Sequence, residues 1–290
     1  MERPPAGQQD PMAFTWIRGR LVVVGYQPDG DSVRFVPDDL ETVRGLENGD
    51  RVEPGERDGS LQLRLDAIDS PETHYQDEAQ PLADEARDTL LAAVGFSDVA
   101  YDDGGTVTSS TPESVPAAIC AALVEVNGRP VALLVTGDAV TSHADGDEVD
   151  PATVVDASVN AVQTSNGRAY LTLYTSTPEP VRARFLELAA AATGAGSVWA
   201  ADRSGGFTLA TQADIGPEGQ LILPKLFRRA TDYLRADSER TFVEWVKAQG
   251  ADNDPVEVAG QRTNLAELLT EDGDRVSLTV PLADLVFVED

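Results

Sequence analysis

The sequence predicts a mixed α+β protein built around a strongly curved sheet. The dipeptides Asp29-Gly30 and Asn127-Gly128 each lie between two strand-like runs, which is the strongest short signal for a β-hairpin. Between these hairpins, residues 60–69 alternate apolar with polar side chains, as a strand with one buried face does. Because runs with helical spacing interrupt and follow the strands, the expected unit is a curved sheet covered by helices.

The elements of this unit can be assigned in chain order from their hydrophobic spacing. Strands are expected at residues 21–24, 32–36, 60–69, 117–126 and 129–137, and helices at residues 81–96, 151–167 and 178–196. The first of these helices has acidic residues near its start and a glycine near its end, which are usual signals for helix ends. Together the elements form one unit over roughly residues 14–203.

The two ends of the chain are expected to behave differently. Residues 1–13 are rich in proline and glutamine and are predicted to be disordered. Residues 204–290 contain two amphipathic helical stretches, at 221–234 and 240–248, and a terminal pair of strands within 274–290. We expect this accessory α/β segment to pack on the preceding unit, because its apolar strand would aggregate if it were exposed.

The charge of the chain is strongly acidic. Its 290 residues include 22 Lys and Arg against 50 Asp and Glu, a net charge of −28. Sequence-independent nucleic-acid binders usually show the opposite balance. Adaptation to salt and a GC-rich genome both remain open as reasons for the acidity. The acidity therefore says more about solubility than about a ligand.

Cysteine content and hydrophobic segments limit the cellular setting. The single cysteine, Cys120, excludes an intrachain disulfide. The N-terminal residues contain no apolar run like that of a secretory leader, and no stretch approaches the ~20 apolar residues of a membrane helix. We therefore expect a cytoplasmic protein without a membrane partner, and the oligomeric state stays open.

A cluster of charged residues follows the third expected strand, in the stretch "RLDAIDSPETHY". The strand ends in Asp69, Glu72 follows three residues later, and Arg64 lies upstream. Strict alternation places Arg64 and Asp69 on opposite faces of a strand, because their separation is odd. Both can serve one site only if the strand bulges or bends between them.

Three charged segments follow one another along the chain: "DGDSV" with Asp31, "RLDAIDSPET" with Arg64, Asp69, Ser70 and Glu72, and "NGRPVALLV" with Arg129. In this order they resemble the staphylococcal nuclease family. A fourth segment, "VNAVQTSNGRAYLTLYTSTPEP" through "SVWAAD", resembles the end of the family's domain, so that the resemblance covers residues 16–203. It implies a staphylococcal nuclease-like domain at residues 14–203, with a five-stranded OB-type β-barrel and packed helices.

The resemblance also implies Ca²⁺-dependent hydrolysis of DNA or RNA phosphodiesters. It assigns the carboxylates of Asp31 and Asp69 and the backbone carbonyl of Ser70 as metal ligands. It assigns Glu72 as the base or water-orienting group, and Arg64 and Arg129 as phosphate clamps. These residue types suit the chemistry, because Ca²⁺ prefers oxygen ligands and arginine can bind phosphate with two hydrogen bonds.

Plainer interpretations of the same residues remain open. Taken singly, Asp31 and Arg129 are typical hairpin residues, and Arg64 is typical of a solvated strand face. The basic helix "KLFRRATDYLR" is expected to balance a local acidic surface, although a phosphate-binding face is the alternative. As a whole, the chain could also be a non-catalytic OB-fold module that binds nucleic acid or protein. Asn127 stands where the family often has an aromatic residue, which puts its nucleotide pocket in doubt.

Overall fold

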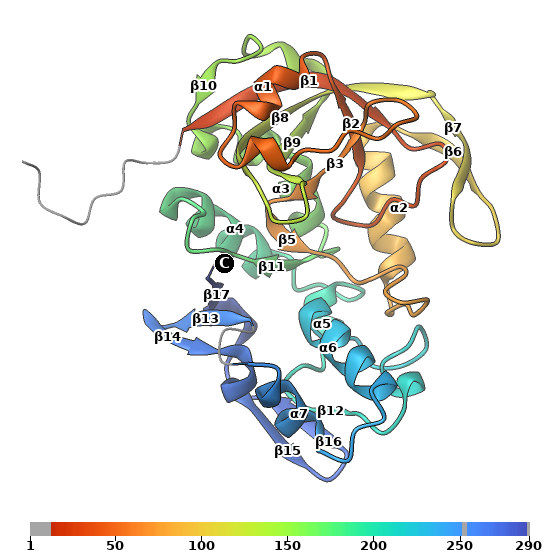
Figure 1. Ribbon diagram of the computed structural model, residues 1–290, viewed down its shortest axis with the longest axis vertical. Coiled ribbons are helices and arrows are strands. Elements are labelled where there is room, and N and C mark those ends of the chain that lie inside the picture. Colours follow the sequence, from red (N-terminus) through yellow and green to blue (C-terminus); the bar gives the residue numbers. More distant parts are fainter. Residues whose placement is uncertain (1–12, 251–253, 289–290) are drawn as a thin grey trace, which may run out of the picture.

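The structure is a computed structural model that describes residues 13–250 and 254–288. It contains two hydrophobic cores, one formed by residues between 14 and 189 and the other mainly by residues between 198 and 287. We call residues 13–197 the barrel unit and the described residues from 198 onward the C-terminal unit. In Figure 1 the barrel unit lies above the C-terminal unit. The disorder expected for residues 1–13 falls, except for Ala13, outside the described residues.

The barrel unit is built on one sheet that curls back on itself. Its path runs β3-β2-β1-β8-β9-β4, and β10 pairs with β1 outside this path. These strands are β1 (Phe14–Val22), β2 (Arg34–Pro37), β3 (Leu61–Gln62), β4 (Arg64–Leu65), β8 (Ser114–Val124), β9 (Pro130–Thr136) and β10 (Glu148–Val149). The two ends of the path, β3 and β4, are successive parts of one extended segment. Because β4 pairs with β9 at the other end of the path, the sheet forms a nearly closed barrel.

Both expected hairpins are present, but their connections differ. Strands β8 and β9 are joined by a short turn in which Gly128 has a φ of +78°, and a Cβ there would meet the backbone oxygen of Arg51 at 2.6 Å. Strands β1 and β2 pair as expected but are separated by residues 23–33, a longer connection than a two-residue turn. Within this loop, Asp29 pairs with Ser32, so the Asp-Gly signal marks a local turn.

The chain changes partners between Arg64 and Asp69. Strand β5 (Ala67–Asp69) leaves the barrel sheet and pairs with β11 (Tyr170–Thr172). The change occurs at Ala67, whose φ of +65° is unusual for a residue with a side chain. This is the bend that Arg64 and Asp69 need if both are to serve one site.

The expected helices of the barrel unit are confirmed as α2 (Ala83–Val94) and α4 (Glu179–Ala191), and a short α1 (Leu40–Arg44) precedes them. The helix expected at residues 151–167 is shorter, α3 (Val159–Ser165), because residues 151–157 form 3-10 turns. Helix α3 lies between α2 and α4. Its buried Asn160 accepts a hydrogen bond from the backbone of Leu134 and donates to the carbonyls of Asp66 and Ala132. One amide thus joins α3 to the barrel where β4 ends. An additional hairpin, β6 (Ser97–Tyr101) with β7 (Val107–Thr111), extends from this unit (Figure 1).

The C-terminal unit combines helices with two small sheets. The two predicted amphipathic helices are confirmed as α6 (Pro224–Arg235) and α7 (Phe242–Ala248), after a short α5 (Val198–Ala201). One sheet holds β12 (Phe207–Thr208), β15 (Leu269–Asp272) and β16 (Arg275–Leu278), and the other holds β13 (Pro255–Val258), β14 (Gln261–Asn264) and β17 (Leu285–Phe287). The expected terminal strand pair is therefore wrong: β16 and β17 exist but belong to different sheets, because each pairs with a strand from earlier in the chain.

Backbone and side-chain contacts join the two units. The backbone of Phe287 donates to Leu173 at 2.7 Å and accepts from Thr175 at 2.9 Å, so β17 runs beside the barrel unit. The buried ring of Tyr170 belongs to the core of the C-terminal unit. Within the described residues, no helix is both long and apolar enough to cross a membrane.

Candidate functional site

A cavity of about 630 Å³ lies where α6 faces the barrel unit. Both units line it. The barrel unit contributes Arg51, Arg64, Glu72, Tyr75, Arg129 and Tyr174, and α6 contributes Lys225 and Arg228. We call this cavity the central cleft. Its lining includes five of the 22 Lys and Arg residues but only four of the 50 Asp and Glu residues, which makes it markedly more basic than the chain.

The structure brings three of the sequence-predicted residues, Arg64, Glu72 and Arg129, to the central cleft. Arg64 Nη2 donates to the hydroxyl of Tyr174 at 3.4 Å. Arg129 Nε donates to Glu125 Oε1 at 2.8 Å, within its own hairpin. Both guanidiniums are thus held by partners from the barrel unit.

The other three predicted residues, Asp31, Asp69 and Ser70, adjoin the cleft without lining it. The backbone N–H of Ser70 donates to Asp31 Oδ2 at 3.3 Å. The backbone carbonyl of Asp31 accepts from the N–H of Leu65 at 3.0 Å, which places the loop beside β4. The side chain of Asp69 is only 2% exposed. Three of the six predicted residues therefore line the cleft, and the other three are linked to it through β4 and Arg228.

Close packing explains why a glycine precedes Asp31. A Cβ on Gly30 would approach the Cβ atoms of Ala86 and Ser70 to 2.7 Å, so a larger residue would displace the loop. The carbonyl of Gly30 accepts from the side-chain amide of Gln163 at 2.6 Å. A side chain of helix α3 therefore holds the loop that carries Asp31 in place.

Several carboxyl groups around Asp31 lie close together and away from solvent. Burial and the nearby charge of Asp69 raise the pKa of Asp31 to about 7. Burial, Asp31 and Glu72 also raise the pKa of Asp29. Burial raises the pKa of Glu72, although the Arg228 guanidinium opposes this shift. A cation placed among these groups would lower all three pKa values.

Sequence reasoning missed Arg228, which comes from α6 in the C-terminal unit. Its Nη1 and Nη2 atoms donate to Asp69 Oδ1 and Oδ2 at 3.3 and 3.0 Å, and Nη1 also donates to Glu72 Oε1. Burial raises the pKa of Asp69, but Arg228 and then Arg64 outweigh it and hold that pKa below its usual value. The basic composition of α6 was the only signal, and it did not indicate that the partners would be these carboxylates.

The donor set suits a hard cation, but one of its members is engaged. Asp31, Asp69 and the Ser70 carbonyl offer only oxygen, which is the preference of Ca²⁺. Yet both oxygens of Asp69 accept hydrogen bonds from Arg228. In residues 13–250 and 254–288, no three His, Cys, Asp or Glu side chains gather as a possible metal cluster. A metal here would thus depend on two carboxylates, a carbonyl and solvent.

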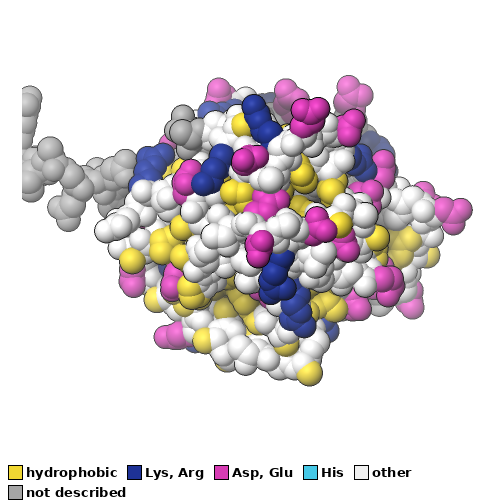
Figure 2. Space-filling view, turned by 90° about the horizontal axis from the view of Figure 1, so that it is seen from below, with side chains coloured by type: hydrophobic (Ala, Val, Ile, Leu, Met, Phe, Trp, Pro, Cys, Tyr) yellow, Lys and Arg dark blue, Asp and Glu magenta, His cyan; other side chains and the backbone are white. Residues whose placement is uncertain are grey.

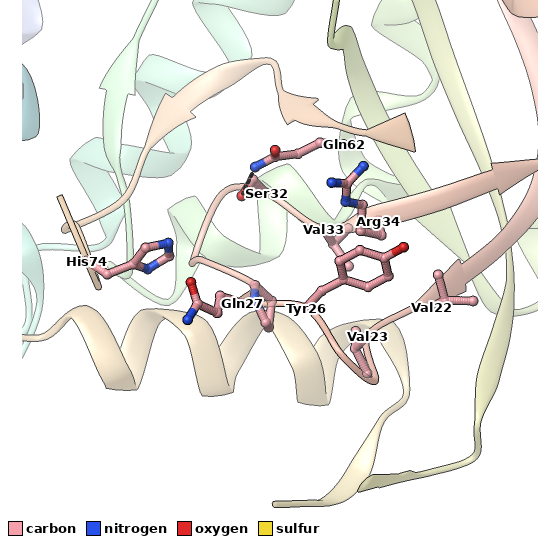
Figure 3. A pocket seen from close by; sticks show the side chains of 10 residues that line it. Val22, Val23, Tyr26, Gln27, Ser32, Val33, Arg34, Gln62 and His74 are labelled. Carbon is pink, nitrogen blue, oxygen red and sulfur yellow. Dashed lines mark hydrogen bonds between the residues drawn. The ribbon is translucent and has the colours of Figure 1, made fainter. Parts of the chain in front are cut away.

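Two further cavities extend from the central cleft across the barrel. A cavity of about 600 Å³ shares Arg51 and Arg129 with the cleft and is also lined by Arg34 and Gln62. A smaller one, of about 200 Å³, shares Arg34 and Gln62 with it and adds the Tyr26 ring (Figure 3). The Arg34 guanidinium lies 4.7 Å from the centroid of that ring. A line of arginines therefore runs from the central cleft to Tyr26.

Comparison with known proteins adds no family to this description. No protein-family model matches the chain, and no curated protein matches it either. The resemblance to the staphylococcal nuclease family therefore rests on the quoted sequence motifs alone.

Proposed function

We propose that the chain is a Ca²⁺-dependent phosphodiesterase that hydrolyses DNA or RNA, on an OB-type barrel of the staphylococcal nuclease kind. The observation that carries the proposal is the convergence of the motif residues. Arg64, Glu72 and Arg129 line one cleft, and Asp69 and Glu72 are close enough to share one arginine.

Each side chain has a role that its surroundings support. Arg64 and Arg129 bind the phosphate oxygens, and for Arg129 this means exchanging the carboxylate of Glu125 for phosphate. Glu72 orients the attacking water and accepts its proton. The pKa of Glu72 is raised toward neutral pH, and a general base is most effective when its pKa is near the working pH. Asp31, Asp69 and the Ser70 carbonyl would hold Ca²⁺, which supplies charge neutralisation and polarisation of the phosphate.

The distribution of charge supports a nucleic-acid substrate. Figure 2 shows Asp and Glu side chains scattered over the face seen from below, with Lys and Arg gathered in a few places. The central cleft and its two neighbouring cavities together carry Arg34, Arg51, Arg64 and Arg129 on the barrel unit. A polyanion that is repelled by most of the surface would find its favourable contacts along this line.

A nuclease assay on the purified chain tests the proposal. Single-stranded DNA and RNA are offered with Ca²⁺ or with chelator, and Glu72→Gln is compared with the native protein. We expect Ca²⁺-dependent cleavage, and a loss of about 10²–10³ in kcat for Glu72→Gln with substrate binding retained. Turnover that is unchanged in Glu72→Gln would remove Glu72 from the mechanism and with it the proposal.

A specific observation favours the non-catalytic alternative. Arg228 already neutralises Asp69 and Glu72, and Glu125 already pairs with Arg129, so the site is electrostatically satisfied in part without metal or substrate. A barrel that binds nucleic acid or protein needs no metal ligands. Binding of single-stranded DNA that persists in chelator, without cleavage under any metal condition, would favour this second function.

A further inference from the structure

The inference concerns Arg228 and rests on the proposed Ca²⁺ site. A single guanidinium engages both oxygens of Asp69 and one oxygen of Glu72. Asp69 is 2% exposed and Glu72 is 16% exposed, so solvent can do little to replace this cation. The group that neutralises the candidate metal ligand therefore comes from the C-terminal unit, outside the segment that carries the motifs.

We propose that Arg228 is the resident cation of this site, and that a divalent cation binds Asp31 and Asp69 only when Arg228 withdraws from Asp69. The C-terminal unit thereby sets the metal affinity of the barrel unit. Metal binding becomes an exchange of one positive group for another and not the filling of a vacant site.

Electrostatics makes joint occupancy unfavourable. Ca²⁺ binds carboxylate oxygens at about 2.3–2.6 Å. Arg228 Nη2 lies 3.0 Å from Asp69 Oδ2, so a cation on the same carboxylate would lie within a few ångströms of the guanidinium. Two positive charges at that separation in a partly buried site repel strongly, because the effective dielectric there is about a quarter of that of water.

The side chain of Arg228 can move while α6 stays docked. The carboxylate of Asp232 on α6 accepts from the hydroxyl of Tyr75 at 3.0 Å and from the amide of Gln76 at 2.6 Å. The buried amide of Gln80 donates to the carbonyl of Ile222, just before α6, at 2.8 Å. These contacts hold the helix independently of Arg228.

The central cleft offers Arg228 a place to go. Its side chain is 25% exposed and already forms part of the cleft lining. Asp254, the nearby carboxylate of the C-terminal unit, is already paired with Lys225 and Arg229, at 3.2 and 2.7 Å. A released guanidinium therefore remains in the cleft, which Arg64 and Arg129 also line, and an anionic ligand bound there could pair with it.

Calorimetric titration of the full chain with Ca²⁺ tests the exchange. Arg228→Gln removes the resident cation, and Arg235→Gln is the matched control. Arg235 is on the same helix and contacts Glu78 at 3.4 Å, outside the site. The substitution Arg235→Gln therefore removes the same charge at an exposed position. We expect the Ca²⁺ dissociation constant to fall about tenfold or more in Arg228→Gln, and to change by less than about threefold in Arg235→Gln.

Thermal unfolding supplies a second readout. Arg228→Gln removes the hydrogen-bonded cation of the buried Asp69 and leaves Arg64 as the main positive group near it, so Ca²⁺ should raise the melting temperature of this variant more than that of the native chain. Should Arg228→Gln not fold, Arg228→Lys keeps the charge but loses the two-pronged contact, and its gain in Ca²⁺ affinity should be smaller but measurable. Asp31→Asn, combined with either variant, should abolish the gain.

The outcomes separate this inference from the proposed function. If the Arg228 variants bind Ca²⁺ more tightly but the native chain does not cleave DNA or RNA, the exchange is supported and the phosphodiesterase is not. Ca²⁺ affinity that is unchanged or weaker in the Arg228 variants overturns the exchange, even if the native chain cleaves DNA.

Discussion

The two walls of the central cleft are built in different ways. On the barrel wall, Arg129 pairs with Glu125 four residues earlier, and Arg64 contacts Tyr174 of the same unit. On the other wall, α6 sends Arg228 across to Asp69 and Glu72 of the barrel unit. The arginines of the barrel wall thus find their partners within their own unit, whereas Arg228 on the α6 wall finds its partners in the other unit.

This difference shows where the candidate site can be perturbed. Breaking the ion pair between a hairpin arginine and its neighbour in the same hairpin lowers the free energy of unfolding only slightly. Arg228 instead neutralises buried carboxylates of another unit, so that its loss changes the charge balance of the site itself. The candidate site is therefore a property of the whole chain and not of residues 14–203 alone.

The largest expected effect comes from removing one arginine from each wall. Arg228→Ala should lower the free energy of unfolding by about 3–5 kcal/mol, because it leaves buried carboxylates unpaired. Arg129→Ala should lower it by no more than about 1 kcal/mol, because the Arg129–Glu125 pair is partly solvated. Urea unfolding of both variants in chelator measures the difference. If both variants lost the same free energy of unfolding, the arginines of the two walls would contribute equally to stability, which contradicts the comparison.

The buried amide of Gln80 gives the next effect. It accepts from the backbone of Glu72 at 3.1 Å and donates to the carbonyl of Ile222 at 2.8 Å, joining the site loop to the C-terminal unit. Gln80→Ala should cost about 1–3 kcal/mol, because it leaves buried partners unsatisfied. Gln76→Ala, which removes an exposed contact to Asp232, should cost less than about 0.5 kcal/mol. The urea assay above compares the two, and similar losses would deny Gln80 a bridging role.

The loss of folding stability at acid pH should also differ between the two walls, but by less than the effects above. Burial raises the pKa of Asp254, but Arg229 and Lys225 outweigh it and hold the pKa below its usual value. The unfolded chain then binds the proton more readily, so the stabilisation is present above about pH 4 and is lost as the pH falls through the lower folded pKa.

Asp254→Asn should remove that sensitivity. The loss of stability between pH 6 and pH 3 should be smaller in Asp254→Asn than in the native chain, because an asparagine at this position takes up no proton. Glu125→Gln, on the barrel wall, should give a smaller change in the same sense, because Glu125 is more exposed and has a single arginine partner. Unfolding measured at both pH values tests this, and an unchanged pH profile in Asp254→Asn would contradict it.

The smallest effect concerns the line of arginines beyond the cleft. If nucleic acid follows that line, Arg51→Gln should reduce the salt dependence of binding by about one unit of log–log slope. Arg184→Gln should leave the slope unchanged, because Arg184 lies on α4 with Asp156 and Glu187 as partners and lines none of the three cavities. Fluorescence anisotropy with labelled single-stranded DNA in chelator gives both slopes. Equal slopes for the two variants would place the nucleic acid elsewhere.

Local signals in the sequence were sufficient for most elements. The glycine turns, the alternation in residues 60–69 and the helical spacing before Gly95 and Gly167 predicted strands and helices that the structure contains. These signals act over a few residues, where backbone geometry and hydrophobic spacing depend on adjacent side chains. The motif residues could likewise be selected from the sequence as candidates for one site.

Only the tertiary structure decided how those candidates are arranged and neutralised. The left-handed backbone at Ala67, which brings Arg64 and Asp69 to one neighbourhood, depends on pairing β5 with a strand about 100 residues later. The contact of Arg228 with Asp69 spans 159 residues, and the separation of β16 from β17 reflects their pairing with earlier strands. Such contacts form where packing of whole elements buries complementary groups, so no short pattern in the sequence can indicate them.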